Sequence, residues 1–304
     1  MNELVSVVIP TYKRKDAFNR AINSVLKQTY ENIEIIVVDD NVDEDISEYV
    51  QKSVENLQRN SNYNIQYIKN EQNLGGALTR NEGLKAAKGT YVAFLDDDDE
   101  YLEKNIEKKV ERFKKSNDGR LALVYGWCES RNSEGETLVQ YKNNTVGNCI
   151  FEAMYECVAA TTQWLCKRDA LLDVDGFTDV PSKQDSTLIL KLLYKGYTLD
   201  RVSEVLTIYY EHNEGRISSG NLRNLQGEIM LRNYMREHYG LLSEQEKQQV
   251  EGNISLRIMI LAMDNKKYTE AKEEYKDLIN NRYYKKQARK IHLKKYIKKR
   301  IMGL

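Results

Sequence analysis

Short apolar segments alternate with amphipathic segments over the first hundred residues of the chain. Four segments are short and rich in β-branched residues, as buried strands are, at 4–9, 33–38, 65–68 and 91–95. Residues 15–28 and 45–57 carry apolar side chains at helical spacing, and Gly75-Gly76 opens a third helix that ends before Gly89. This alternation of strands and helices predicts a parallel, doubly wound sheet.

The fourth strand runs directly into four consecutive carboxylates, Asp96–Asp99. Folding alone does not favour such mutual repulsion, whereas Mg²⁺ or Mn²⁺ is commonly held by one or two carboxylates together with substrate phosphates. Asp39 and Asp40 end an earlier strand. Right-handed crossovers place both acid groups at one edge of the sheet, where ligands bind. The alternative is a solvated acidic loop that caps a helix beginning at Tyr101.

Composition limits the class of protein. A chain of 304 residues with 41% hydrophobic content can bury a large core in one or two domains. Its 46 basic and 46 acidic residues cancel, so net charge does not indicate a nucleic acid partner. The four cysteines lack metal-binding spacing, which favours free thiols in a reducing compartment. We see no signal peptide and no run of 18 apolar residues, so we expect a cytoplasmic protein that is either soluble or peripheral on the inner face of the membrane.

The segment after the acid run has weaker signals. Strands are expected at 121–125 and 161–166, and Asn132-Ser133-Glu134-Gly135 is typical of a hairpin turn before a strand at 137–141. Asp185 precedes an amphipathic stretch, where it fits the N-cap of a helix beginning near Ser186.

The end of the chain is helical and then basic. We expect a helical appendage at 221–281, resembling a helical hairpin, followed by a basic tail at 282–304. Ten Lys or Arg residues and no acid fall between Arg282 and Arg300. A basic amphipathic helix is typical of contact with a membrane surface or nucleic acid. We expect an anionic membrane surface and no nucleic acid; the alternative is a solvated tail.

Several motifs resemble those of family 2 glycosyltransferases, in the same order. They are Ser6-Val7-Val8-Ile9-Pro10-Thr11-Tyr12, Val37-Val38-Asp39-Asp40-Asn41, Asn73-Leu74-Gly75-Gly76 with Ala77 and Arg80-Asn81, and Ala87-Lys88-Gly89-Thr90-Tyr91 before the acid run. The resemblance implies a GT-A-type, Rossmann-like, doubly wound α/β fold with a mixed, mostly parallel sheet and a C-terminal helical appendage. It further implies a glycosyltransferase domain at 1–220, with a nucleotide-binding half at 1–100 and an acceptor half at 101–220.

The same resemblance assigns roles to individual residues. Nucleotide binding falls to Pro10, Thr11, Tyr12, Asp40, Arg80, Asp96 and Asp97. Asp40 would accept a hydrogen bond from a uracil ring nitrogen, which favours a UDP-sugar. Asp98 would ligate Mn²⁺ or Mg²⁺, and His212 would contact the metal or the diphosphate, although a packed or solvent-facing histidine is an equal alternative. Lys13 stands where the family usually has asparagine.

Asp185 matches the catalytic base of the family, while Gln184 replaces its usual glutamate. Inverting transfer needs a carboxylate to accept the proton of the acceptor hydroxyl, and a cation to offset the charge of the leaving diphosphate. We therefore expect an inverting, metal-dependent glycosyltransferase that moves a sugar from a nucleotide-sugar donor to a glycan or lipid-linked acceptor in surface polysaccharide or glycoconjugate synthesis.

Two alternatives come from other classes of protein. A sugar-phosphate nucleotidyltransferase would share the sheet and the metal, but it needs a glycine-rich phosphate loop after the first strand. Residues 11–14 contain no glycine. A non-catalytic signalling module also ends strands in paired aspartates, but it would be shorter and would not need Asp185.

Overall fold

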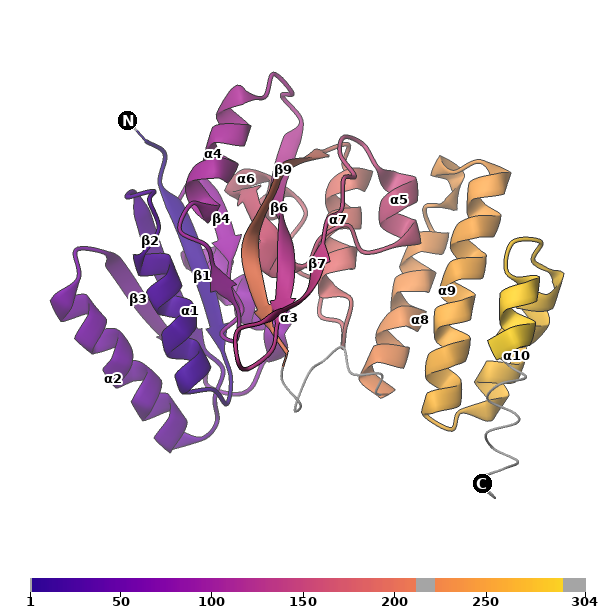
Figure 1. Cartoon of the computed structure of the whole chain (residues 1–304), viewed down its shortest axis with the longest axis horizontal. Helices are drawn as coiled ribbons and strands as arrows, with labels where there is room; N and C mark the ends of the chain where they lie inside the picture. Colours follow the sequence, from indigo (N-terminus) through magenta and orange to yellow (C-terminus); the bar gives the residue numbers. More distant parts are fainter. Residues whose placement is uncertain (1, 212–221, 292–304) are drawn as a thin grey trace. The chain divides into compact units, whose positions relative to one another are not determined.

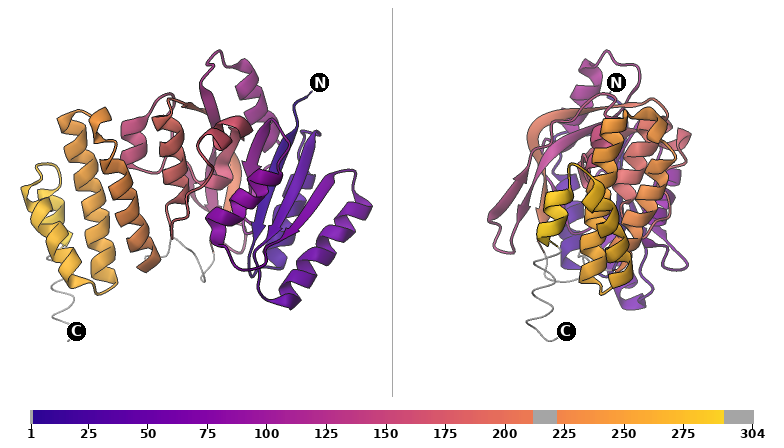
Figure 2. Two further views of the ribbon diagram at one scale, coloured as in Figure 1. Left: turned by 180° about the vertical axis from the view of Figure 1, so that it is seen from behind. Right: turned by 90° about the vertical axis from the view of Figure 1, so that its right-hand side faces the viewer.

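The computed structural model describes residues 2–211 and 222–291 of the chain. It contains two compact units, each described here by itself. We call Met1–Cys149, Val158–Asp179 and Leu188–Asn213 the sheet unit. We call Ile150–Cys157, Val180–Thr187 and Glu214–Leu304 the helical unit. Figures 1 and 2 label or colour the elements of both units along the sequence.

Nine strands of the described residues form the one sheet of the sheet unit. They are β1 (Val5–Thr11), β2 (Ile33–Asp39), β3 (Asn64–Lys69), β4 (Tyr91–Phe94), β5 (Glu100–Tyr101), β6 (Leu121–Arg131), β7 (Thr137–Tyr141), β8 (Trp164–Lys167) and β9 (Thr198–Tyr210). Their order is β3-β2-β1-β4-β8-β6-β9-β5, and β7 pairs with β6. The first four strands in this order are parallel, and β8 pairs antiparallel with both β4 and β6.

The parallel half of the sheet confirms the predicted alternation of strands and helices. Its register pairs Thr11 with Asp39 and Asp39 with Lys69, so the carboxyl ends of β1, β2 and β3 lie at one edge. The sequence is β-branched at β1 and β2 because both strands are buried on both faces, whereas β3, at the edge of the sheet, is partly exposed.

Helices cover both faces of this half of the sheet (Figures 1 and 2). The helices of the sheet unit are α1 (Asp16–Leu26), α2 (Glu44–Asn60), α3 (Gly75–Ala86), α4 (Asn105–Lys115), α6 (Arg168–Asp173) and most of α7 (Gln184–Tyr194). α1 and α2 lie on one face and α3 lies on the other. Phe18, Ile22 and Val25 of α1 are fully buried, as their predicted helical spacing requires.

Two local predictions need correction, and a third is confirmed. No helix begins at Tyr101, because Glu100–Tyr101 is β5, which pairs with β9, and the helix begins only at Asn105. Residues Thr161–Gln163 form a 3₁₀ turn, and the strand expected there is limited to Trp164–Lys167. The hairpin predicted around Asn132–Gly135 is confirmed by the pairing of β6 with β7.

The helical unit contains α5 (Ile150–Tyr155), the first turn of α7, α8 (Leu222–Arg236), α9 (Glu244–Asp264) and α10 (Tyr268–Asn280). Ser243 begins α9 with a capping box, because its side chain accepts from the Glu246 amide and the Glu246 side chain accepts from the Ser243 amide. α9 packs against α5, α8 and α10 (Figure 1). Tyr284 and Ala288, beyond α10, are also buried. Among the described residues, no helix is both long enough and apolar enough to cross a membrane.

Candidate active site

The loop after β1 contacts both groups of acids that the sequence singled out. The backbone N–H of Tyr12 donates to Asp97 Oδ2 at 3.0 Å, and the N–H of Lys13 donates to Asn41 Oδ1. Lys13 has φ +59°, in the left-handed region that favours glycine or asparagine. The predicted convergence of the two strand ends is therefore present as a network of contacts around residues 11–13.

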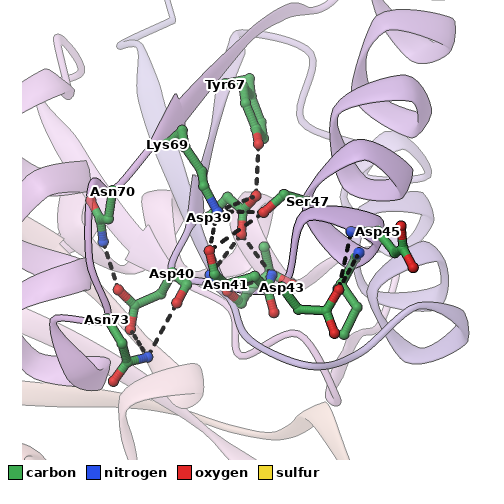
Figure 3. Close-up of polar contacts among 12 residues, drawn as sticks. Asp39, Asp40, Asn41, Asp43, Asp45, Ser47, Tyr67, Lys69, Asn70 and Asn73 are labelled. Carbon is green, nitrogen blue, oxygen red and sulfur yellow. Dashed lines mark hydrogen bonds and ion pairs between the residues drawn. The ribbon is translucent and has the colours of Figure 1, made fainter.

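Four hydrogen-bond donors surround the Asp40 carboxylate, and Figure 3 shows the two that belong to the side chains of Asn70 and Asn73. Its carboxylate accepts from the side-chain amides of Asn70 at 2.8 Å and Asn73 at 2.9 Å, and from the N–H groups of Leu74 at 2.8 Å and Gly75 at 2.9 Å. A carboxylate offers about four lone-pair sites. A further hydrogen bond from a uracil ring would need one of these donors to leave.

Asp39 is buried beside Asp40 and is also hydrogen-bonded (Figure 3). Its carboxylate accepts from the amide N–H of Asn41 at 2.9 Å and from the hydroxyl of Tyr67 at 2.7 Å. Burial, followed by the hydrogen bond to Asp39, raises the pKa of the Tyr67 hydroxyl. Lys69 Nζ lies 3.6 Å from Asp39 Oδ2. Neutral donors and one lysine thus satisfy the acids after β2.

The acids after β4 have charged partners instead. Arg80 pairs with Asp96, and Arg14 pairs with Asp98 and lies 3.6 Å from Asp97 Oδ1. The two most buried acids of this run are Asp97 and Asp99, and each is only 8% exposed. Of the residues named here, the sequence had singled out Arg80 and the acids themselves; Arg14 was missed, although it stands in the basic stretch that follows β1.

Burial and like charge disfavour ionisation of Asp97 and Asp99. Burial, followed by the neighbouring Asp98, raises the pKa of Asp97 to about 7, against the lowering effects of Arg14 and of the hydrogen bond from the Tyr12 N–H. Burial, then Asp98 and Asp96, also raises the pKa of Asp99 well above its usual range, and the hydroxyl of Thr162, 2.9 Å from Asp99 Oδ2, opposes this shift.

The acid run has the chemistry of a site that takes a hard divalent cation. Its donors are carboxylate oxygens, which suit Mg²⁺ and Mn²⁺, and added positive charge would relieve the crowding around Asp98. Within residues 2–211 and 222–291, no group of three or more His, Cys, Asp or Glu side chains is arranged to hold a metal by itself. A cation bound at these acids would therefore need further ligands, such as oxygen atoms of a substrate. His212 lies outside the described residues.

Two further residues near Asp98 were missed by sequence reasoning. Arg20, on α1, donates from Nη2 to the backbone oxygen of Asp98 at 2.8 Å. Its guanidinium lies 3.8 Å from the ring centroid of Tyr210, at the end of β9. No local pattern in the sequence indicates these contacts, because Asp98 and Tyr210 are both distant from Arg20 in sequence.

Asp185 belongs to the helical unit and requires a correction. The helix begins at Gln184, so Asp185 lies inside its first turn and is not the N-cap residue. Its Oδ1 accepts from the N–H of Ser186 at 2.7 Å, and its Oδ2 lies 3.6 Å from the sulfur of Cys157. The half-buried carboxylate remains where a helix N-terminus favours negative charge.

Comparison with known proteins identifies the family. The family described as "Glycosyl transferase family 2" matches residues 6–172, over half of the chain. The chain belongs to this family. A curated relative, the UDP-Glc:alpha-D-GlcNAc-diphosphoundecaprenol beta-1,3-glucosyltransferase WfaP of Escherichia coli, is 29% identical over 229 residues, covering 73% of this chain and 83% of the relative.

Solved structures show the same fold. S. aureus TarS 1-349, in complex with UDP-GlcNAc, superimposes with a TM-score of 0.61 at 17% identity, covering 94% of this chain and 92% of that one. The mannosyltransferase PcManGT from Pyrobaculum calidifontis, in complex with GDP-Man and Mn²⁺, gives a TM-score of 0.62 at 17% identity, covering 92% and 76%. The predicted GT-A-type fold with a helical C-terminal region is confirmed.

Proposed function

We propose that this glycosyltransferase is inverting and metal-dependent, and that it moves a sugar from a UDP-sugar to a hydroxyl of a glycan or lipid-linked acceptor. The observation that carries the proposal is the run Asp96–Asp99, held to the loop after β1 and flanked by Arg14 and Arg80. WfaP is named for transfer from UDP-Glc to a lipid-linked acceptor, and TarS was crystallised with UDP-GlcNAc, which supports this donor and acceptor class.

The nucleotide is assigned to the residues around the β1 loop. They are Pro10, Thr11, Tyr12, Asp40, Arg80, Asp96 and Asp97. Tyr12 is 39% exposed at the end of β1, so its ring is free to stack on a base. Because Asp40 is saturated, its part is to fix the loop that ends at Gly75, whose φ of +77° only glycine adopts readily.

Asp98 and its neighbours are the residues that we assign to the departing diphosphate. Asp98, with His212 as a further ligand, would hold Mn²⁺ or Mg²⁺, and the positive charge of the bound ion would offset the charge of the departing diphosphate. Arg14 now pairs with Asp98 and can instead pair with a phosphate oxygen when a cation takes the carboxylate. Arg20 holds the backbone of Asp98 and so fixes the position of its carboxylate.

Asp185 is the proposed general base. A carboxylate in this role accepts the proton of the acceptor hydroxyl as the oxygen bonds to the anomeric carbon. Gln184 cannot replace it, because an amide does not accept a proton near neutral pH. The Gln184 side chain instead donates to the backbone oxygen of Val180 at 3.3 Å.

The Asp185→Asn variant tests this function. The full-length protein is incubated with Mn²⁺, an acceptor and each of several UDP-sugars, and UDP release is measured. Turnover should fall by roughly two to four orders of magnitude, because proton acceptance is lost while shape is kept. UDP affinity and melting temperature should stay near wild type. Asp179→Asn, at an exposed carboxylate, is the control. Retention of most activity in Asp185→Asn would place the base elsewhere.

The cellular setting follows from the same relatives and from the basic tail. We propose that the enzyme works on the cytoplasmic side of a membrane, in polysaccharide synthesis, and that residues 282–304 attach it to anionic lipids. Lys285, Lys286 and Arg289 are exposed. Removing residues 292–304 leaves buried Tyr284 in place and should reduce binding to anionic liposomes at low salt, since each basic residue contributes about 1 kcal/mol. Equal binding by the shortened chain would contradict this attachment.

A further inference from the structure

The segment that carries Asp185 is packed against α8 within the helical unit. A Cβ atom on Gly227 would lie 2.0 Å from Ser182 Oγ and 2.9 Å from the backbone oxygen of Ser182. These distances are shorter than real Cβ contacts, so only glycine allows this approach. The residues just before Asp185 therefore lie directly on the surface of α8.

A buried carboxylate on the same helix holds this segment. Glu228 is 1% exposed, and its Oε1 forms an ion pair with Lys183 Nζ at 2.9 Å. The guanidinium of Arg257, on α9, donates to both oxygens of Glu228, from Nε and Nη2, each at 3.1 Å. A buried carboxylate needs such partners, because an uncompensated charge is costly. Lys183 lies two residues before Asp185, so its ion pair with Glu228 holds the segment that precedes Asp185.

Arg257 also contacts the end of α5, which leads into the segment beside the Asp185 carboxylate. Its Nη1 donates to the backbone oxygen of Tyr155, at the end of α5, at 3.1 Å. Asn253, one turn earlier on α9, donates to the same oxygen. Cys157 follows two residues later, and its sulfur lies 3.6 Å from Asp185 Oδ2. One guanidinium is thus connected to both segments that flank the carboxylate.

We propose that the Arg257–Glu228 pair positions Asp185 for catalysis, so that the helical unit is a necessary part of the catalytic apparatus. The inference rests on the proposed function, in which Asp185 is the base. A base must be held within a fraction of an ångström of its working position, and supporting contacts determine whether it is. Arg257 and Glu228 are positioning residues, since they act through the segments 155–157 and 183–185.

A second ion pair in the helical unit provides a matched control. Arg232 on α8 donates from Nη1 to both oxygens of Glu274 on α10, at 2.6 and 2.7 Å. The two side chains are 13% and 10% exposed. This pair has the same chemistry as Arg257–Glu228, in which the side chains are 30% and 2% exposed, but it joins α8 to α10 and not to the segments that flank Asp185.

The experiment compares Glu228→Gln with Glu274→Gln in the full-length protein. For Glu228→Gln, kcat should fall by about tenfold to a hundredfold, because small displacements of a catalytic group cost that much, while KM for the UDP-sugar changes less than about twofold. Glu274→Gln should lower the melting temperature about as much as Glu228→Gln does, but it should keep kcat near wild type. Arg257→Lys, which keeps the charge but not the fork of donors, should also lower kcat.

A readout independent of turnover follows the position of Cys157, the exposed one among four free cysteines. The rate of its alkylation by iodoacetamide, located by mass spectrometry, should change severalfold in Glu228→Gln and remain unchanged in Glu274→Gln. Equal effects of the two variants on kcat and on alkylation, or no effect of Glu228→Gln on either, would overturn the proposal. If Asp185→Asn keeps full activity, the base assignment fails and the proposal fails with it; if Asp185→Asn is inactive while Glu228→Gln keeps its kcat, the proposal alone fails.

Discussion

The two acid groups of the sheet unit look alike in sequence but differ in their surroundings. Both Asp39–Asp40 and Asp96–Asp99 follow buried parallel strands. After β2, neutral amide and hydroxyl donors satisfy the carboxylates, and the charged side chain of Lys69 lies beside them, 3.6 Å from Asp39. After β4, arginines pair with the acids, and burial, followed by the like charge of the neighbouring aspartates, raises the pKa of Asp97 and of Asp99.

This difference separates an acid that builds a loop from acids that can bind a ligand. A carboxylate whose lone pairs are all taken gains nothing from a cation, because a cation would displace existing hydrogen bonds. A carboxylate held near others of like charge gains directly from one. The residues that contact the carboxylates therefore distinguish Asp39–Asp40 from Asp96–Asp99, whereas the position of the two groups in the sheet does not.

The largest expected effect is on activity, in Asp98→Asn. Removing this charge should lower metal-dependent transfer by two to three orders of magnitude, roughly 3–4 kcal/mol in the transition state. Stability should not fall, because the change relieves repulsion of Asp97 and Asp99. The transfer rate measured against Mn²⁺ concentration, and melting temperature, test both parts. A variant with unchanged Mn²⁺ dependence would remove the assigned difference between the two groups.

Asp40→Asn should show the opposite pattern. An amide has one acceptor oxygen, and its NH₂ group faces donors, so at least one of the four bonds to Asn70, Asn73, Leu74 and Gly75 must be lost. We expect a loss of about 2–3 kcal/mol in the free energy of unfolding, measured with urea. Wild-type stability in this variant would show that Asp40 does not hold the loop.

Sequence reasoning found the strands and both acid groups because local patterns determine them. A buried parallel strand has a continuous apolar run, and the residues that follow it lie at a known edge of the sheet. β5 was missed because two residues have no periodicity, and their pairing with β9 joins segments about a hundred residues apart.

The surroundings of the site could not be predicted for a similar reason. Thr162 reaches Asp99, and Arg20 reaches Tyr210, only through the fold. The grouping of Asp185 with the helical unit depends on Glu228 and Arg257, which look in sequence like ordinary exposed charges of an appendage. Local pattern carries no information on such long-range partners.

Lys109 in the sheet unit is a buried positive charge, and its partners can be compared with those of the buried acids. Lys109, on α4, is fully buried, donates to Asn105 Oδ1 at 2.7 Å and lies 5.4 Å from the ring centroid of Tyr101. Burial lowers the pKa of Lys109 from 10.5 to about 7, and the nearby thiols of Cys128 and Cys166 only partly oppose the shift. Neutral partners thus leave this charge poorly compensated.

Lys109→Met should therefore stabilise the protein, by about 1–3 kcal/mol near pH 8, since one pKa unit corresponds to about 1.4 kcal/mol and the lost contacts offset part of the gain. Between pH 7 and 10.5 the unfolded chain binds a proton at Lys109 that the folded protein does not. Wild-type stability should then rise with pH relative to the variant, and the advantage of Lys109→Met should shrink toward pH 10.5. Urea unfolding at several pH values measures this; a constant difference between the two proteins would contradict it.

The smallest effect is expected in the loop that joins the two acid groups. Lys13 has φ +59°, which costs an ordinary side chain roughly 1 kcal/mol and asparagine less. Lys13→Asn should raise the free energy of unfolding by about 0.5–1 kcal/mol without weakening UDP binding, because the N–H that meets Asn41 is kept. Lys13→Ala is the control: it removes the ammonium that lies 5.0 Å from the Tyr12 ring centroid but keeps the backbone cost, so it should not stabilise. Equal stabilisation by both variants would show that the lysine side chain, and not the backbone, is unfavourable there.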